Sequence, residues 1–100
     1  MKVALRPRDL KTLRNVFKRF PEIKEARVFG SRANGGAKRA SDIDLAIRAP
    51  AMNAEKWNEF REVLEEAPII FEYDLVRFDK LPAGPLRKKI LAQGIVIYPS

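Results

Sequence analysis

Residues 30–48 read GSRANGGAKRASDIDLAIR, and the closing DIDLAIR has the strict alternation of a β-strand with one buried face. Its apolar and polar positions alternate as Ile43, Leu45 and Ile47 against Asp42, Asp44 and Ala46. Two carboxylates side by side on the face outside the core are close enough to chelate one cation or to bridge two. Because such anions repel each other, a bound Mg²⁺ gives the pair a purpose. The alternative is a solvated strand face, since DxD is a common tripeptide.

The segment before this strand has the character of a phosphate-binding turn. Ala26 to Phe29 is predicted as a short strand that ends at Gly30, and residues 31–41 are polar. Exposed N–H groups at the turn, with the Ser31 hydroxyl, are suited to phosphate oxygens, and Arg32 adds positive charge. An ordinary turn glycine followed by a solvated basic loop is the alternative.

The other expected elements follow from apolar spacing and from capping residues. They are helices at 9–20, at 53–67 and up to Gln93, with strands near 70–78 and at 95–98. Asp9 and Asn53 are the expected N-caps of the first two helices. This order predicts an α/β (α+β) protein of one small domain, residues 1–100, with a mixed sheet, helices packed on one face and a water-exposed polar face opposite.

Composition narrows the chemistry. The chain has no cysteine and no histidine, which leaves carboxylates as its only strong metal ligands and favours hard cations. The net charge of +7 is concentrated in residues 1–50, which hold 13 basic and 5 acidic side chains. Such a basic half suits an anionic ligand, whether nucleotide phosphate, RNA or an acidic partner. No long apolar run indicates a signal peptide or a membrane span, so we expect a cytoplasmic protein.

Some conspicuous residues are interpreted as structural. Trp57 and Phe60, like Phe17 and Phe20, fall on helical stripes and are expected in the core. Lys88 and Lys89 are expected on the solvent side of the last helix, where a partner contact is the alternative.

The combination of Gly30-Ser31-Arg32 with the strand SDIDL, with residues 32–41 between the serine and Asp42, resembles the signature of the nucleotidyltransferase β superfamily. More narrowly, the chain resembles the minimal nucleotidyltransferase group, whose final helix and strand are similar to LRKKILAQGIVIY. The resemblance implies a third carboxylate on a neighbouring strand. FEYDLVRF offers Asp74 and Glu72 on one strand face, and the family pattern selects Asp74, with Glu72 in reserve.

The resemblance also implies a reaction. AMP, or another nucleoside monophosphate, would pass from ATP, or another triphosphate, to a hydroxyl group in a reaction assisted by two Mg²⁺ ions, or by Mn²⁺. Asp42, Asp44 and Asp74 are the implied metal ligands and catalytic residues, and Asp74 would also help to take the proton of the hydroxyl. Gly30, Ser31 and Arg32 are the implied phosphate-binding residues.

A protein partner follows from the same resemblance. Minimal nucleotidyltransferases are commonly paired with a small helical HEPN protein as a toxin–antitoxin system, in which the antitoxin attaches AMP to its partner, here expected at a tyrosine. Two other functions stay open: an antitoxin that masks its partner without catalysis, and a basic nucleic-acid-binding domain. The three carboxylates favour the enzyme over the first, and the lack of an RNA-binding aromatic motif disfavours the second.

Overall fold

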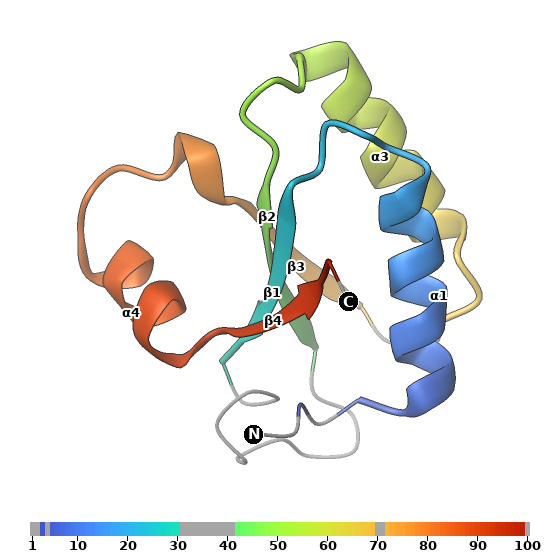
Figure 1. Cartoon of the computed structure of the whole chain (residues 1–100), viewed down its shortest axis with the longest axis horizontal. Coiled ribbons are helices and arrows are strands. Elements are labelled where there is room, and N and C mark those ends of the chain that lie inside the picture. Colours follow the sequence, from blue (N-terminus) through green and yellow to red (C-terminus); the bar gives the residue numbers. More distant parts are fainter. Residues whose placement is uncertain (1–2, 4, 31–41, 70–71, 100) are drawn as a thin grey trace.

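A mixed sheet of four strands, in the order β3-β2-β1-β4, forms the centre of the protein. The computed structural model describes residues 3, 5–30, 42–69 and 72–99. Along the chain the elements are α1 (Pro7–Lys18), β1 (Glu25–Phe29), β2 (Ile43–Arg48), α3 (Ala54–Glu66), β3 (Tyr73–Arg77), the 3-10 turn η1 (Phe78–Lys80), α4 (Pro85–Gln93) and β4 (Ile95–Tyr98) (Figure 1). β1 is antiparallel to β2 and β4, whereas β2 and β3 are parallel. The mixed α/β architecture predicted from the sequence is therefore confirmed.

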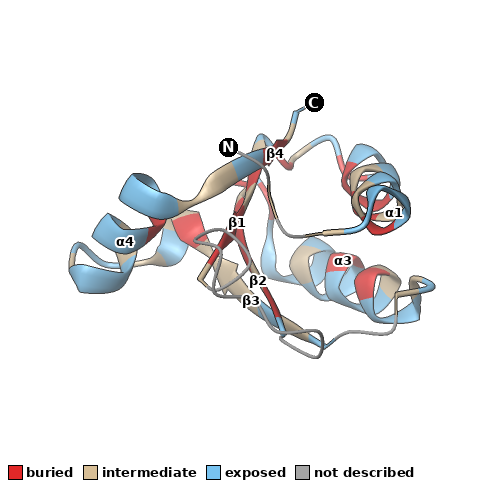
Figure 2. Ribbon diagram, turned by 90° about the horizontal axis from the view of Figure 1, so that it is seen from below, coloured by how far each residue is buried: buried red, intermediate tan, exposed pale blue. Residues whose placement is uncertain are grey.

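The two long helices α1 and α3 cover one face of the sheet (Figure 2). Their apolar stripes meet the apolar positions of β2 in one cluster, which includes Leu13, Phe17, Phe60, Leu64, Ile43, Leu45 and Ile47. The Phe60 ring lies 6.2 Å from the Phe17 ring and 5.4 Å from the Phe20 ring, between centroids. The predicted aromatic core is confirmed, with Trp57 packed at its edge.

The opposite face, expected to be open to water, is partly covered by α4 (Figure 2). Ile90 of α4 is fully buried and packs with Phe29, Ala46 and Phe78 in a second, smaller cluster. Phe29, Ala46 and Val76 are apolar residues on this face, and the burial of their surface accounts for the cover. The expectation of helices on one face thus holds for α1 and α3, and α4 is a correction to it.

The helix ends agree with the sequence analysis in two cases and differ in one. Asn53 caps α3 by accepting a hydrogen bond from the N–H of Lys56 at 2.8 Å, and α4 ends at Gln93 as expected. α1, however, begins at Pro7, so Asp9 is not its N-cap but lies in the first turn. Proline is favoured at the first helical position because the N–H that it lacks would be unpaired there. Asp9 is buried and accepts hydrogen bonds from Arg6 at 2.8 and 3.2 Å.

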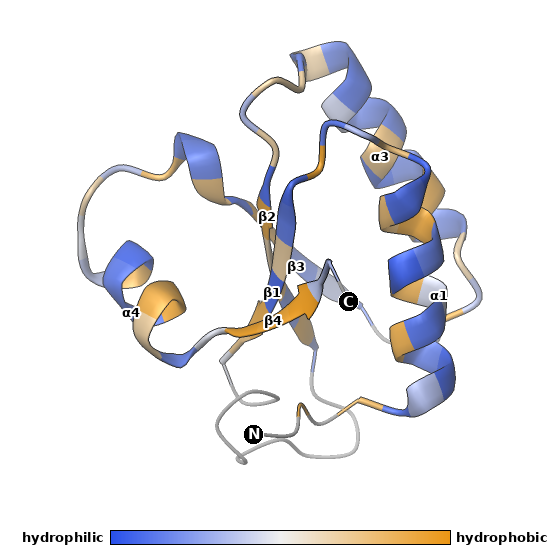
Figure 3. Cartoon of the chain, viewed as in Figure 1, coloured by the Kyte–Doolittle hydropathy of each residue, from blue (hydrophilic) through white to orange (hydrophobic). Residues whose placement is uncertain are grey.

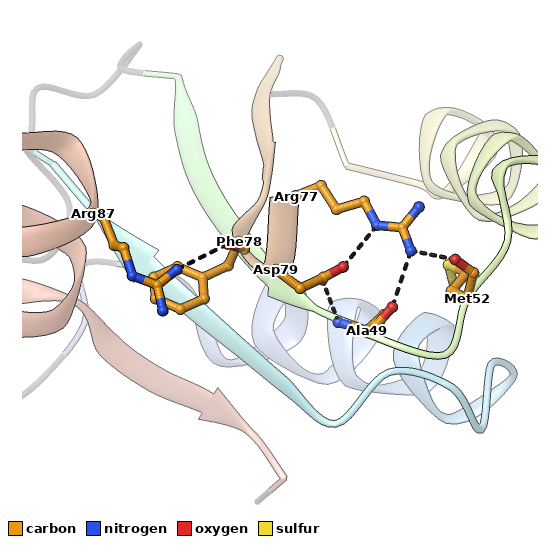
Figure 4. A network of polar contacts seen from close by, with 6 residues as sticks. All are labelled: Ala49, Met52, Arg77, Phe78, Asp79 and Arg87. Atoms are coloured by element: carbon orange, nitrogen blue, oxygen red, sulfur yellow. Dashed lines mark hydrogen bonds and ion pairs between the residues drawn. The ribbon is translucent and has the colours of Figure 1, made fainter. Parts of the chain in front are cut away.

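A polar network ties the end of β2 to β3 and η1 (Figure 4). Asp79 accepts hydrogen bonds from the Ala49 N–H at 2.8 Å and from Arg77 Nε at 3.2 Å. Arg77 Nη2 donates to the carbonyls of Ala49 and Met52, while its guanidinium lies 5.2 Å from the centre of the Trp57 ring. These bonds satisfy a partly buried cation and hold the parallel pair of strands together beyond the sheet ladder.

The second edge strand, β4, is the most apolar strand in composition and is coloured strongly hydrophobic in Figure 3. Its Ile97 is buried in the main core, whereas Val96 is exposed. Within the described part of the chain, none of the helices has the length and apolar character needed to span a bilayer.

Candidate active site

Asp44 and Asp74 are direct neighbours across the parallel strands β2 and β3, where their Cα atoms are register partners. Both lie on the face that carries Ala46, opposite the core residue Leu45. Periodicity alone did not separate Asp74 from Glu72. In the structure Glu72 precedes β3, and its carbonyl accepts a hydrogen bond from the Ile43 N–H at 2.9 Å. Asp74 is therefore the residue level with Asp44.

The two carboxylates share a strained electrostatic environment. Burial raises the pKa of Asp44 above 3.8, and the charges of Asp74 and Asp42 raise it further. A side-chain hydrogen bond with Asp74 also raises the pKa of Asp44, whereas the Lys89 ammonium lowers it. Asp44 therefore holds a proton more tightly than an isolated aspartate does, and a divalent cation beside it would remove the conflict between the charges. The donor set is oxygen only, which is the set that Mg²⁺ prefers.

Gly30, at the end of β1, lies directly against Asp44. Its φ of +72° belongs to the left-handed region, which residues with a Cβ rarely adopt. A Cβ built on Gly30 would stand 2.3 Å from Asp44 Oδ2, far inside van der Waals contact. Glycine is thus needed at this position both for the turn and for room around the carboxylate.

Asp42 lies at the rim of this site. It immediately precedes β2, is exposed, and acts on Asp44 through its charge. No cluster of three acidic side chains close enough to hold a metal ion occurs among residues that the structure describes. The structure therefore brings Asp44 and Asp74 together, whereas Asp42 lies just before β2 at the edge of the pair. Ser31 and Arg32, the other predicted site residues, lie outside the described residues.

Lys89 is a residue whose position the sequence analysis missed. It was interpreted as a solvated charge, and it is exposed, but its ammonium acts on Asp44. The only local signal in the sequence is its place next to the apolar Ile90. That signal does not show that Lys89 lies near Asp44 until the face of the sheet covered by α4 is known.

A large cavity lies on the other face, away from the carboxylates. Its volume is about 640 Å³, and it opens between α3 and the edge strand β3, with Trp57, Arg61, Tyr73 and Leu75 in its lining. Burial, and secondarily the charge of Asp9, raises the pKa of Tyr73 to about 12. Alternate residues of β3 thus face the cavity and the carboxylate site, so this cavity is not the candidate active site.

Residues 11–100 match the family model described as polymerase beta, nucleotidyltransferase. The chain belongs to this nucleotidyltransferase family. The matched residues include Gly30, Asp42, Asp44 and Asp74, so the paired carboxylates lie inside the shared domain. The search of curated proteins found no match to this sequence.

Two solved structures have the same fold. The first is a toxin–antitoxin in complex with AMP-PNP, with a TM-score of 0.73 and 21% identity over 92% of this chain and 74% of that chain. The second is a mutant of the toxin–antitoxin MntA–HpeT, with a TM-score of 0.64 and 21% identity over 93% of this chain and 71% of that one. At this identity the likeness shows the nucleotidyltransferase fold and leaves substrate and partner to be argued from the site.

Proposed function

We propose that this nucleotidyltransferase transfers AMP from ATP to a hydroxyl group, with Asp42, Asp44 and Asp74 as its metal-binding and catalytic residues. The observation that carries the proposal is the pairing of Asp44 with Asp74 in register, with the backbone of Gly30 packed against Asp44. A structural role for two adjacent carboxylates is unfavourable, because their mutual repulsion stabilises nothing. A site for cations explains why both are present.

The residues fit divalent metal. Asp44 and Asp74 offer oxygen ligands from two rigid strands, and Asp42 offers a third group from the rim. Bound between them, Mg²⁺ ions would stabilise the negative charge that develops on the phosphate oxygens and the leaving pyrophosphate. Because the protein supplies no histidine or cysteine, we assign it no covalent intermediate on such a side chain.

Another task falls to the chain's own residues. The Gly30 turn, continued by Ser31 and Arg32, is assigned to the phosphates beyond the one that is attacked. This assignment amounts to positioning and charge stabilisation.

For the acceptor we propose a tyrosine of a helical HEPN-type partner, which would make the chain an antitoxin of the cytoplasm. The proposal is supported by the two similar structures, which are of toxin–antitoxin proteins, one of them bound to AMP-PNP. The exposure of Asp42 and Asp74 agrees with it, because a protein tyrosine needs a site that another surface can approach.

The test uses purified protein, labelled ATP, Mg²⁺ and a HEPN-type partner. Asp44→Asn is expected to lower the transfer of label by at least about a hundredfold, the scale found when a preorganised electrostatic group is lost. Glu72→Gln is the matched control, because it removes an acidic group two residues before Asp74 that lines the cavity on the other face, and it should keep most of the activity. If Asp44→Asn protein neutralises the partner as well as the wild type does, the proposal of an enzyme is wrong and the chain is a masking antitoxin.

A further inference from the structure

α4 presents three consecutive basic residues, Arg87, Lys88 and Lys89, just before its buried Ile90. Ile90 packs on Phe29 and Ala46. Phe29 is the register partner of Asp44 on β1, and Ala46 is the next residue after Asp44 on the same face of β2. Ile90 therefore anchors α4 on the sheet beside Asp44.

The three basic residues have different surroundings. Arg87 is engaged in the fold: its guanidinium lies 4.4 Å from the centre of the Phe78 ring, and it donates to the Phe78 carbonyl at 3.4 Å (Figure 4). Lys88 and Lys89 are both exposed, yet only Lys89 influences Asp44, whose pKa its ammonium lowers. Because successive residues of an α-helix lie about 100° apart, a helix with Ile90 on the sheet turns Lys88 away from the sheet and leaves Lys89 on the flank opposite Arg87. Of the three, Lys89 is therefore the residue whose flank and charge both face Asp44.

Lys89 acts on Asp44 without forming an ion pair with it. The ion pairs found among the described residues join Arg6 with Asp9, Arg27 with Glu25, Lys56 with Glu59 and Arg77 with Asp79. The Lys89 ammonium is thus near the carboxylates but separated from them. An anion seated between α4 and the metal-bearing carboxylates would contact it directly.

From this arrangement we propose that Lys89 binds the triphosphate of the nucleotide on the side of the site opposite the carboxylates. The proposal rests on the proposed function. Two divalent ions would bring four positive charges against the three negative charges of Asp42, Asp44 and Asp74, which leaves the site an excess of positive charge, and Lys89 adds to it. A triphosphate neutralises that excess, so Lys89 makes the site favour metal together with nucleotide over metal alone. Lysine suits this role because its ammonium is a compact charge on a flexible stem.

The experiment compares Lys89→Gln with Lys88→Gln, the neighbouring exposed lysine on the same helix. Isothermal titration measures Mn²⁺ alone, then the non-hydrolysable triphosphate AMP-PNP with Mg²⁺, then AMP with Mg²⁺. For Lys89→Gln we expect affinity for AMP-PNP to fall about tenfold or more, as for the loss of a charge-assisted contact. Affinity for AMP should hardly change, because AMP lacks the outer phosphates, and Mn²⁺ alone should bind at least as tightly as before.

Weaker binding of AMP-PNP without weaker binding of Mn²⁺ distinguishes a substrate contact from a structural role, since a displaced helix would weaken Mn²⁺ binding as well. Lys88→Gln should match the wild type in all three titrations, and Lys89→Arg should recover most of the AMP-PNP affinity. Unchanged AMP-PNP binding in Lys89→Gln overturns the inference while the proposed function stands, and so does an equal loss for Mn²⁺ and AMP-PNP. A wild-type protein that binds neither Mn²⁺ nor AMP-PNP refutes the proposed function itself.

Discussion

The two faces of β2 carry different kinds of side chains and serve different purposes. On one face Leu45 is fully buried under α1 and α3, in the cluster that contains Phe17 and Phe60. On the other face Asp44, the residue before it, is half-buried beside Asp74 and the backbone of Gly30. A single strand thus serves stability and chemistry at alternate positions, because a period of two keeps the two sets of side chains on opposite sides.

The largest effect on stability is expected on the helix-covered face. Phe60→Ala removes a buried ring that contacts the rings of Phe17, Phe20 and Trp57, and should lower the free energy of unfolding by about 3–5 kcal/mol. Chemical denaturation measures this loss. The affinity of the folded fraction for Mg²⁺ with AMP-PNP should stay unchanged, because Phe60 lies on the far side of the sheet.

Since so large a loss can unfold a domain of this size, Ile47→Val is a milder variant of the same face. It should cost about 0.5–1.5 kcal/mol. Weaker nucleotide binding in folded Ile47→Val protein would contradict the separation of the two faces.

A smaller effect, but one on both properties, is expected at Gly30. Gly30→Ala forces a residue with a Cβ to a φ of +72°, which costs about 1–2 kcal/mol. The same Cβ would meet Asp44 Oδ2, so the carboxylate must shift and the binding of Mn²⁺ should weaken. Denaturation and metal titration of this one variant test both statements. Gly84→Ala is the control, because a Cβ at Gly84 meets nothing within 4 Å.

The smallest expected effect is a dependence of stability on pH in metal-free protein. Burial and the charges of Asp74 and Asp42 raise the pKa of Asp44 above 3.8, with Lys89 opposing them. A carboxyl whose pKa is raised by folding stabilises the protein below its unfolded pKa, and this contribution is lost as the pH rises through the folded pKa. Asp44→Asn should therefore gain stability over the wild type as the pH rises from about 4 to about 7.

Urea denaturation in EDTA measures this pH difference, and saturating Mg²⁺ should reverse its sign, because only the wild type then gains the bound metal. A difference that does not change with pH would mean that folding does not raise the pKa of Asp44.

Much of the fold was predictable because its signals are local. Alternation over residues 42–48 predicted β2 and its two faces, and helical spacing predicted the core positions of Phe17 and Phe60. Asn53 was recognisable as a cap because capping depends on residues within one turn. Asp9 misled the same reasoning, since Pro7 starts α1 two residues earlier.

The remaining features depend on distant contacts. Glu72 and Asp74 share one periodicity, so only the pairing of β3 with β2 shows which of them is level with Asp44. The face covered by α4 was not predictable either. This helix buries only Ile90 and leaves Leu86 and Leu91 exposed, so its sequence has no clear apolar stripe that selects a partner surface. The position of Lys89 follows from that packing and could not be predicted without it.

The parallel pairing of β2 with β3 sets the register of Asp44 and Asp74, which are far apart in the chain. Extra residues placed between Arg48 and α3, or between α3 and β3, would lengthen connections without altering which rungs face each other. One residue inserted between Tyr73 and Asp74 would instead turn Asp74 toward the helices and place the inserted residue level with Asp44. Such a protein would retain its connections and lose its charge pair, so tolerance to insertion should change abruptly at the boundaries of β3.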